Sequence, residues 1–494
     1  MSTGKPTLTF SQIINMNVGF FGIQYSFGLQ QSAVNPIYDF LGASPDEIPI
    51  LNLAGPVTGL LIQPIIGALS DKTWSPRFGR RKPYFFIGAV LCSICLFFFP
   101  FSSALWMAAG LLWILDVGNN TAMEPYRAFI ADKLNDEQRP TGFQTQSFFT
   151  GLGQTLANIS LFVFPILIIG KTGAIPNWVF ASFFLGSVCS IATIWWSMYT
   201  TQEIPPSAEE VAEIRRANEG QPHLVVQFFI SVATSLIAYL VLFLIAIPSL
   251  FLPTLLPRLI RWLRENAFTR LAFAQNIEIM EAILVMPKVM WQLALVYLFQ
   301  WYALFCYWQN ASKSVALSVW RATPASDPTA YETAVSWTGL VNGWYNIVTF
   351  LTAFALVWFV QRSSAKVVHF GCLVLAGAGL LVFPFIENKY LLFPTITGFG
   401  IGWASMMGIP YLLVVGGIPR ERYGVYMGII NMMIVVPMIL QTLSFGWVMK
   451  NLLGNNSSHA VLFAGVLLLL AAGATLLIRP QPTSNEMQFN STSH

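Results

Sequence analysis

One carboxylate stands inside an apolar segment, where it could take up and release a proton. The segment runs from Leu112 to Arg127. A helix turning about 100° per residue puts four of its residues on one stripe, namely Asp116, Asn120, Met123 and Arg127. An ionised carboxylate at membrane depth costs at least ~2.5 kcal/mol even on the lenient insertion scale, which favours the neutral acid. Asp116 is therefore a candidate proton carrier, and the alternative is an ion pair that joins two helices.

Two more charged residues lie further along the same segment. Arg127 is about 16 Å along the helix axis from Asp116, so the two side chains cannot touch. Arg127 could bind a substrate, pair with a carboxylate on another helix, or extend its charged end to the membrane surface. Glu124 lies off the stripe, which favours gating or pairing between helices over proton transfer.

Uncharged polar side chains at membrane depth are the candidate substrate-binding residues. Amides both donate and accept hydrogen bonds, and an aromatic face can stack on a pyranose ring. This lining suits a neutral polyhydroxylated ligand better than an ion, although any single amide can instead bond one helix to another. The candidates are Gln24, Gln30, Gln63, Asn119, Asn120, Gln144, Gln300, Trp301, Asn342, Tyr345, Asn346 and Asn431.

The elements that hold these residues must be membrane helices. Of the 494 residues, 55% are hydrophobic and 10% are charged, whereas a soluble domain carries about 25% charged residues. A soluble enzyme is excluded, and the net charge of +4 has no basic polar domain behind it that would bind nucleic acid. The five cysteines fall in apolar runs and the four histidines are scattered, so we expect no disulfide framework, metal site or cofactor.

The apolar runs predict an all-α integral membrane protein with twelve transmembrane helices in two six-helix halves. Each run is long enough for the ~20 residues that cross a bilayer. The expected divisions are a half at 1–200, a linker at 201–284 containing a hydrophobic insert at 224–257, a half at 285–480 and a cytoplasmic tail at 481–494. Paired halves of this kind bind substrate near the midplane between them and rock to alternate access.

Loop charges predict the orientation. Most of the 26 Lys and Arg residues lie on the inner side if both termini are cytoplasmic. Basic residues flank the segment 224–257 on both sides, so we expect it to cross zero or two times, as a membrane-surface or partly re-entrant helix pair. A single ordinary crossing is the alternative. We expect a monomer in the plasma membrane, or in the inner membrane of a bacterium, with the lipid bilayer as its surroundings.

Several motifs resemble one branch of transporters. The stretches Gly55 to Gly67, Ser70-Asp71 and Arg77 to Pro83 resemble helix 2 and the following loop of the sucrose-transporter-like branch of the major facilitator superfamily, the glycoside-pentoside-hexuronide:cation symporters. Leu115 to Phe129 resembles helix 4 of that branch, and Asn431 to Pro437 resembles its helix 11.

The resemblance implies proton-coupled uptake of sucrose, maltose or a related glycoside. It assigns proton acceptance to Asp116 and an essential part in transport to Arg127. Glu124 departs from the glycine that is usual at this position in plant members. No acid lies between Glu47 and Asp71, which disfavours the sodium coupling of wider relatives. An inner-loop gate that latches the two halves is implied at Asp71, Arg77, Gly79, Arg80 and Arg81.

Two other classes of function remain open at this point. An exporter of amphipathic compounds would use the same scaffold, and a non-transporting sugar sensor is conceivable although such proteins usually need a large soluble signalling domain. A membrane enzyme is disfavoured, because the sequence has no Ser-His-Asp set, metal cluster or phosphate-binding glycine loop.

Overall fold

A computed structural model gives the fold. It describes residues 7–135, 138–219, 223–251, 254–266, 269, 273–414 and 423–479. The expected tail at 481–494 lies outside these residues, and so does the side chain of Gln144.

The N-terminal half consists of long helices with short turns between them. Its first helix is continued by a π-helical turn and a short helix, and a two-stranded antiparallel hairpin precedes its last helix. The elements are α1 (Phe10–Leu29), η1 (Gln30–Val34), α2 (Asn35–Phe40), α3 (Ile48–Leu51), α4 (Ala54–Asp71), α5 (Lys82–Phe98), η2 (Phe99–Phe101), α6 (Leu105–Lys133), α7 (Arg139–Leu167), β1 (Lys171–Thr172), β2 (Ile175–Pro176) and α8 (Asn177–Thr200).

The C-terminal half repeats this plan. Within the described residues, four helices of the linker at 201–284, which we call the insert from here on, connect the two halves. The insert comprises α9 (Ala208–Asn218), α10 (Leu224–Phe251), α11 (Leu255–Glu265) and α13 (Ala274–Leu284). The second half comprises α14 (Lys288–Val315), η3 (Ala316–Trp320), α15 (Pro328–Arg362), α16 (Ala365–Val382), η4 (Phe383–Phe385), η5 (Lys389–Leu391), α17 (Leu392–Val414), α18 (Tyr423–Asn451) and α19 (Ser457–Thr475).

The described residues thus contain six long helices in each half, as expected, in addition to α10. Ten helices in that part of the chain are long and apolar enough to cross a membrane, α10 among them. The three bundle helices that fall short of this measure are α1, α6 and α15, which carry many of the polar residues at membrane depth. Two of them, α1 and α6, line the cavity described below, whereas α15 packs on α7 of the other half.

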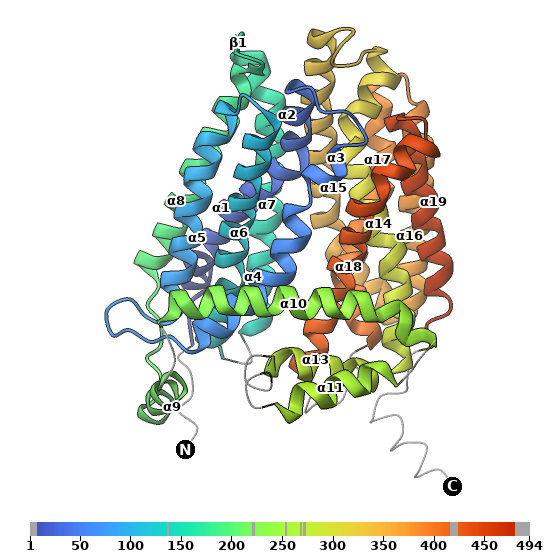
Figure 1. Ribbon diagram of the computed structural model, residues 1–494. Coiled ribbons are helices and arrows are strands. Elements are labelled where there is room, and N and C mark those ends of the chain that lie inside the picture. The colour runs from blue at the N-terminus through green and yellow to red at the C-terminus, as the bar shows by residue number, and fades with distance from the viewer. Residues whose placement is uncertain are drawn as a thin grey trace.

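The helices of each half pack side by side, and the halves meet mainly along two pairs of long helices. Within the halves, α1 packs on α7 and α8, and α14 packs on α19. Between the halves, α7 packs on α15 and α4 packs on α18. Figure 1 shows the β-hairpin at one end of the bundle and the insert at the other. We call these the hairpin end and the insert end.

Glycines allow close helix crossings inside the N-terminal half. A Cβ added to Gly88 on α5 would lie 2.5 Å from the carbonyl oxygen of Gly118 on α6. Close backbone approach through small residues is a common way for membrane helices to associate, because lipid supplies little hydrophobic drive between them. The Gly88–Gly118 crossing therefore fixes α6, the helix that carries Asp116, against α5.

The insert does not run along the bundle. Figure 1 shows α10 lying across the other helices near the insert end. It packs on α4, while α13 packs on α18. The insert therefore contacts both halves.

Candidate functional site

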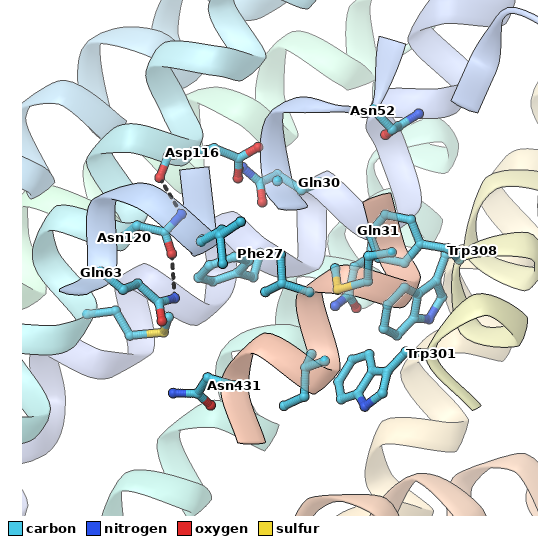
Figure 2. A pocket seen from close by; sticks show the side chains of 18 of the residues that line it. Phe27, Gln30, Gln31, Asn52, Gln63, Asp116, Asn120, Trp301, Trp308 and Asn431 are labelled. Carbon is cyan, nitrogen blue, oxygen red and sulfur yellow. Dashed lines mark hydrogen bonds between the residues drawn. The ribbon is translucent and has the colours of Figure 1, made fainter. Parts of the chain in front are cut away.

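A cavity of about 740 Å³ lies between the two halves. The N-terminal half lines it with α1, η1, α2, the turn before α4, α4, α6 and α7, and the C-terminal half lines it with α14, α17 and α18. Among the described residues of the insert, Tyr239 on α10 also lines it. Figure 2 shows Asp116, Asn120 and Gln63 on one side of this space, and Trp301 and Trp308 on the other.

Asp116 lies in the polar wall of the cavity. Its residue is only 3% exposed, and its Oδ1 accepts a hydrogen bond of 3.1 Å from Gln30 Nε2. A Cβ added to Gly55 would lie 3.6 Å from the other carboxylate oxygen. Within the described part of the chain, no Lys or Arg forms an ion pair with Asp116. The carboxylate is therefore supported by an amide and is not locked to a cation.

A chain of amides extends this wall from Asp116 along α6. Asn120 Nδ2 donates to the backbone oxygen of Asp116 at 2.9 Å and to Thr58 Oγ1 at 3.1 Å. Gln63 Nε2 donates to Asn120 Oδ1 at 2.6 Å, as drawn in Figure 2. These bonds orient the amides of α4 and α6. Gln63, Asp116 and Asn120 all line the cavity.

The four residues of the predicted stripe, Asp116, Asn120, Met123 and Arg127, all line the cavity. Glu124 lines it too, and its Oε1 lies 3.6 Å from Arg127 Nη1 on the same helix. Both side chains are partly exposed, so this pair is weak. Glu124 therefore holds the guanidinium of Arg127 only weakly.

Other amides from the predicted set line the same space. Gln24 on α1 accepts a hydrogen bond of 2.9 Å from Gln154 Nε2 on α7. Asn431 on α18 also lines the cavity and is exposed to it. Gln154 lines the cavity as well, and the lining contains amides that the sequence did not predict, namely Gln31, Asn35, Asn52 and Gln309.

The facing wall is aromatic and comes from the C-terminal half. The ring centroids of Trp301 and Trp403 are 5.7 Å apart, and those of Trp308 and Trp403 are 5.5 Å apart, both edge to face. Only Trp301 was predicted. A signal for Trp308 was available, since Trp301, Phe305 and Trp308 recur at a spacing of four and three residues on one face of α14.

Several predicted residues lie outside the cavity lining. Asn342 on α15 donates to Ser32 Oγ at 3.0 Å across the two halves and accepts a bond of 3.0 Å from Tyr307. Asn346 donates to the backbone oxygen of Asn342, and the ring of Tyr345 packs on Phe399. These three predicted residues therefore support the contact between halves and the core of the C-terminal half.

Asn119 and Gln300 are also buried away from the cavity. Asn119 on α6 donates to Ser26 Oγ on α1 at 3.0 Å and accepts a hydrogen bond from Cys92 Sγ. The amide of Gln300 is fully buried and forms no hydrogen bond with any described residue. Its side chain does not line the cavity.

The predicted gate loop is tied to its own half in this structure. Asp71 pairs with Arg80 at 3.4 Å and with Arg81 at 2.5 Å, and Arg81 also pairs with Asp132 at 3.1 Å. The carboxylate of Glu203, just after α8, accepts backbone hydrogen bonds from Arg80 and Arg81. This network stiffens the turn between α4 and α5.

Two further residues shape that turn. Gly79 has φ of +83°, a left-handed conformation that favours glycine, and the guanidinium of Arg77 lies 5.2 Å from the ring centre of Phe78. For the residues of this loop, no ion pair to the C-terminal half is found among the described positions.

Residues 16–442 match the profile of the Major Facilitator Superfamily. The chain belongs to this superfamily. Across 157 residues, this superfamily member is 31% identical to Sucrose transport protein SUC3 of Arabidopsis thaliana, a match covering 27% of the chain and 26% of that protein. Across 228 residues it is 25% identical to Sucrose transport protein SUT5 of Oryza sativa subsp. indica, covering 38% of the chain and 41% of that protein. The matches thus span well under half of the length of these relatives.

Solved structures agree on the fold of this superfamily member. It is similar to the inward-open conformation of the xylose transporter XylE from E. coli, with a TM-score of 0.60, 14% identity, and coverage of 96% of this chain and 97% of that one. It is also similar to the nucleoside transporter NupG, with a TM-score of 0.60, 13% identity, and coverage of 96% and 99%. At these identities the similarity concerns the fold. The chain is a multi-pass membrane protein whose curated relatives are sugar transporters.

Proposed function

We propose that this protein is a proton-coupled symporter that carries a disaccharide or glycoside of the sucrose or maltose type into the cell by alternating access. The observation that carries the proposal is the pairing of Asp116 and its amides with a tryptophan wall across one cavity. Amides match the hydroxyls of a sugar, and indole faces match the apolar side of its rings. The similarity to sucrose transport proteins supports the same class of cargo.

Coupling of proton and sugar transport follows from the free-energy cost of an ionised Asp116 at membrane depth. With the cavity open to the side of high proton concentration, Asp116 takes up a proton and its charge is removed. Sugar then binds between the amides of α4 and α6 and the indoles of α14 and α17, and the neutral loaded carrier can change its facing. A ligand shifts such an equilibrium only by its differential affinity for the two facings, so cargo and proton must both favour the closure.

The orientation in this proposal has the insert end in the cytoplasm, together with both termini, in the plasma membrane. Its support is the distribution of Lys and Arg, which gather near the insert end, as in the loop Arg77 to Lys82 and in α11. Positively charged loops remain on the cytoplasmic side of a membrane. The protein would act as a monomer, because each half supplies one wall of the same cavity.

The test is uptake into proteoliposomes under an imposed proton gradient, with a panel of radiolabelled disaccharides and glycosides. We expect uphill accumulation of at least one of them, abolished by a protonophore. Absence of gradient-driven uptake for the whole panel, with the reconstituted protein folded, would contradict the proposal.

An exporter of amphipathic compounds is the second candidate, and one observation favours it. Four methionines of the C-terminal half line the cavity, as do the tryptophans of that half; they are Met406, Met407, Met432 and Met438. Methionine adapts to varied apolar ligands. The same vesicles separate the two classes, because an exporter would move a lipophilic cation against the proton gradient and sugars would not compete with it.

A further inference from the structure

The helix α10 carries its polar and apolar residues on opposite faces. At about 100° per residue, Gln227, Ser231, Thr234, Ser235 and Tyr239 fall within an arc of about 140°, and all of them are partly buried. The opposite arc is apolar and exposed. Its large side chains, each between 47% and 65% exposed, are Val225, Val226, Phe229, Ile230, Leu236, Ile237 and Leu240.

This arrangement is the reverse of a helix on a water-facing surface, whose apolar face turns to the protein. No charged residue lies between Leu224 and Phe251. Figure 1 shows α10 lying across the bundle at the level of the helix ends, and not along the bundle. Such a helix turns its polar face to the protein and its apolar face outward. At the level of the helix ends, the apolar face fits contact with lipid acyl chains.

The neighbouring helix α11 adds charge at the same end. Arg258 and Arg261 are exposed, and Trp262, which directly follows Arg261, is 58% exposed. Arginine and tryptophan are the side chains that meet phosphate headgroups and the interfacial layer of a membrane. The chemistry of α10 and α11 together therefore fits phospholipid, with acyl chains on the first and phosphates on the second.

The insert also links the two helices that form one side of the cavity. On the N-terminal half, α10 packs on α4. On the C-terminal half, Tyr426 on α18 donates a hydrogen bond of 3.4 Å to the backbone oxygen of Ala282 on α13. Between them, Arg264 on α11 pairs with Glu281 on α13 at 2.6 Å. The insert is a continuous connection from α4 to α18.

The two linked helices touch each other nearer the hairpin end. A Cβ added to Gly59 on α4 would lie 3.9 Å from Val435 on α18. Closer to the insert end, Gly67 on α4 and Asn431 on α18 both line the cavity. Tyr239, which α10 contributes, lines the cavity as well. Tyr239 therefore completes the part of the cavity wall that α4 and α18 leave open near the insert end.

We propose that α10 is a lipid-bound strap lying in the plane of the cytoplasmic leaflet. Its Tyr239 forms the cavity wall between α4 and α18, on the side where cargo is released. The cytoplasmic assignment rests on the proposed function. The contact of α10 with lipid and the place of Tyr239 in the cavity wall do not depend on the proposed function. Rocking of the halves changes the distance between α4 and α18, so the strap must shift in the lipid each time the insert end opens.

Two measurements on the full-length protein in proteoliposomes test this inference without needing the cargo. In a background with the five native cysteines replaced, a spin label at Leu236→Cys is predicted to collide more with oxygen than with a water-soluble nickel chelate. The label at Glu209→Cys, on the exposed surface of α9, is predicted to show the opposite preference and is the control. Chelate access at Leu236→Cys equal to that at Glu209→Cys would overturn the lipid contact.

The second measurement follows a cavity thiol. A membrane-impermeant maleimide is applied from the insert side to Asn431→Cys, with and without Tyr239→Ala. We expect labelling to become severalfold faster with Tyr239→Ala and to stay unchanged with Phe229→Ala, which removes an aromatic ring from the lipid-facing side of the same helix. Equal labelling rates for the two alanine variants would refute the placement of Tyr239 in the cavity wall. Since the readout is access and not transport, it can fail while sugar symport stands, and the reverse also holds.

Discussion

Asp39 and Lys313 form an ion pair of 2.5 Å that joins the N-terminal half to the C-terminal half. The two side chains are 3% and 11% exposed, and the hydroxyl of Tyr331 donates to the same carboxylate. A second pair, Lys171 with Glu332, joins the hairpin to α15. The halves are therefore held together by charge at the hairpin end, opposite to the insert.

Removing one partner of the buried pair Asp39–Lys313 should lower the stability of the protein much more than removing both partners. Lys313→Met leaves an uncompensated carboxylate in the contact between the halves, and losses of about 3–5 kcal/mol are typical for such changes. The double variant Asp39→Asn with Lys313→Met should recover most of that loss. Thermal unfolding in detergent measures both variants.

The exposed pair of Arg321 and Glu387 is the matched control. Its atoms are 3.5 Å apart with side chains 80% and 77% exposed, so Arg321→Met should leave the unfolding temperature nearly unchanged. If the double variant at Asp39 and Lys313 unfolded as early as Lys313→Met alone, the ion pair would not be the reason for the loss.

The tryptophan wall should contribute to the affinity for cargo. Trp308→Ala removes the indole beside Trp403 and should weaken binding by about tenfold, which corresponds to about 1.4 kcal/mol, while Trp308→Phe keeps a ring and should retain most of the affinity. Trp106→Ala is the control, because that indole is 76% exposed on the outer side of α6. Equilibrium binding of the transported sugar to purified protein measures all three, and an equal loss at Trp106 would rule out a local effect.

The crossing of α5 and α6 should tolerate no added carbon. Gly88→Ala would bring a methyl group to 2.5 Å from the Gly118 carbonyl oxygen, and overpacking of this kind costs about 1–3 kcal/mol. Gly110→Ala on α6 meets nothing within 4 Å and should be neutral or slightly stabilising, because alanine favours helix. The unfolding temperatures of the two variants test this, and similar values would show that the crossing can relax.

The polar wall of the site could be anticipated from the sequence for a physical reason. A charged or amide side chain inside an apolar run is costly, so it stands out, and the helical period then gives its face. Asp116, Asn120 and Arg127 were predicted in this way, and all three line the cavity.

The aromatic wall could not be predicted as well. Tryptophan is stable both in a cavity and against lipid, and the sequence does not distinguish Trp403 in the lining from Trp195, which is 59% exposed on α8. Likewise, an amide such as Asn342 can face a ligand or bond the other half. Which of these occurs depends on how the halves meet, and single-helix periodicity carries no information about that.

The claim that Asp116 couples proton to cargo is tested most directly by separating accumulation from exchange. In proteoliposomes loaded with unlabelled sugar, Asp116→Asn should still exchange it for labelled sugar, since the amide keeps the shape and neutrality of the protonated acid. The same variant should accumulate nothing under an imposed proton gradient. Full uphill accumulation by Asp116→Asn would contradict the account.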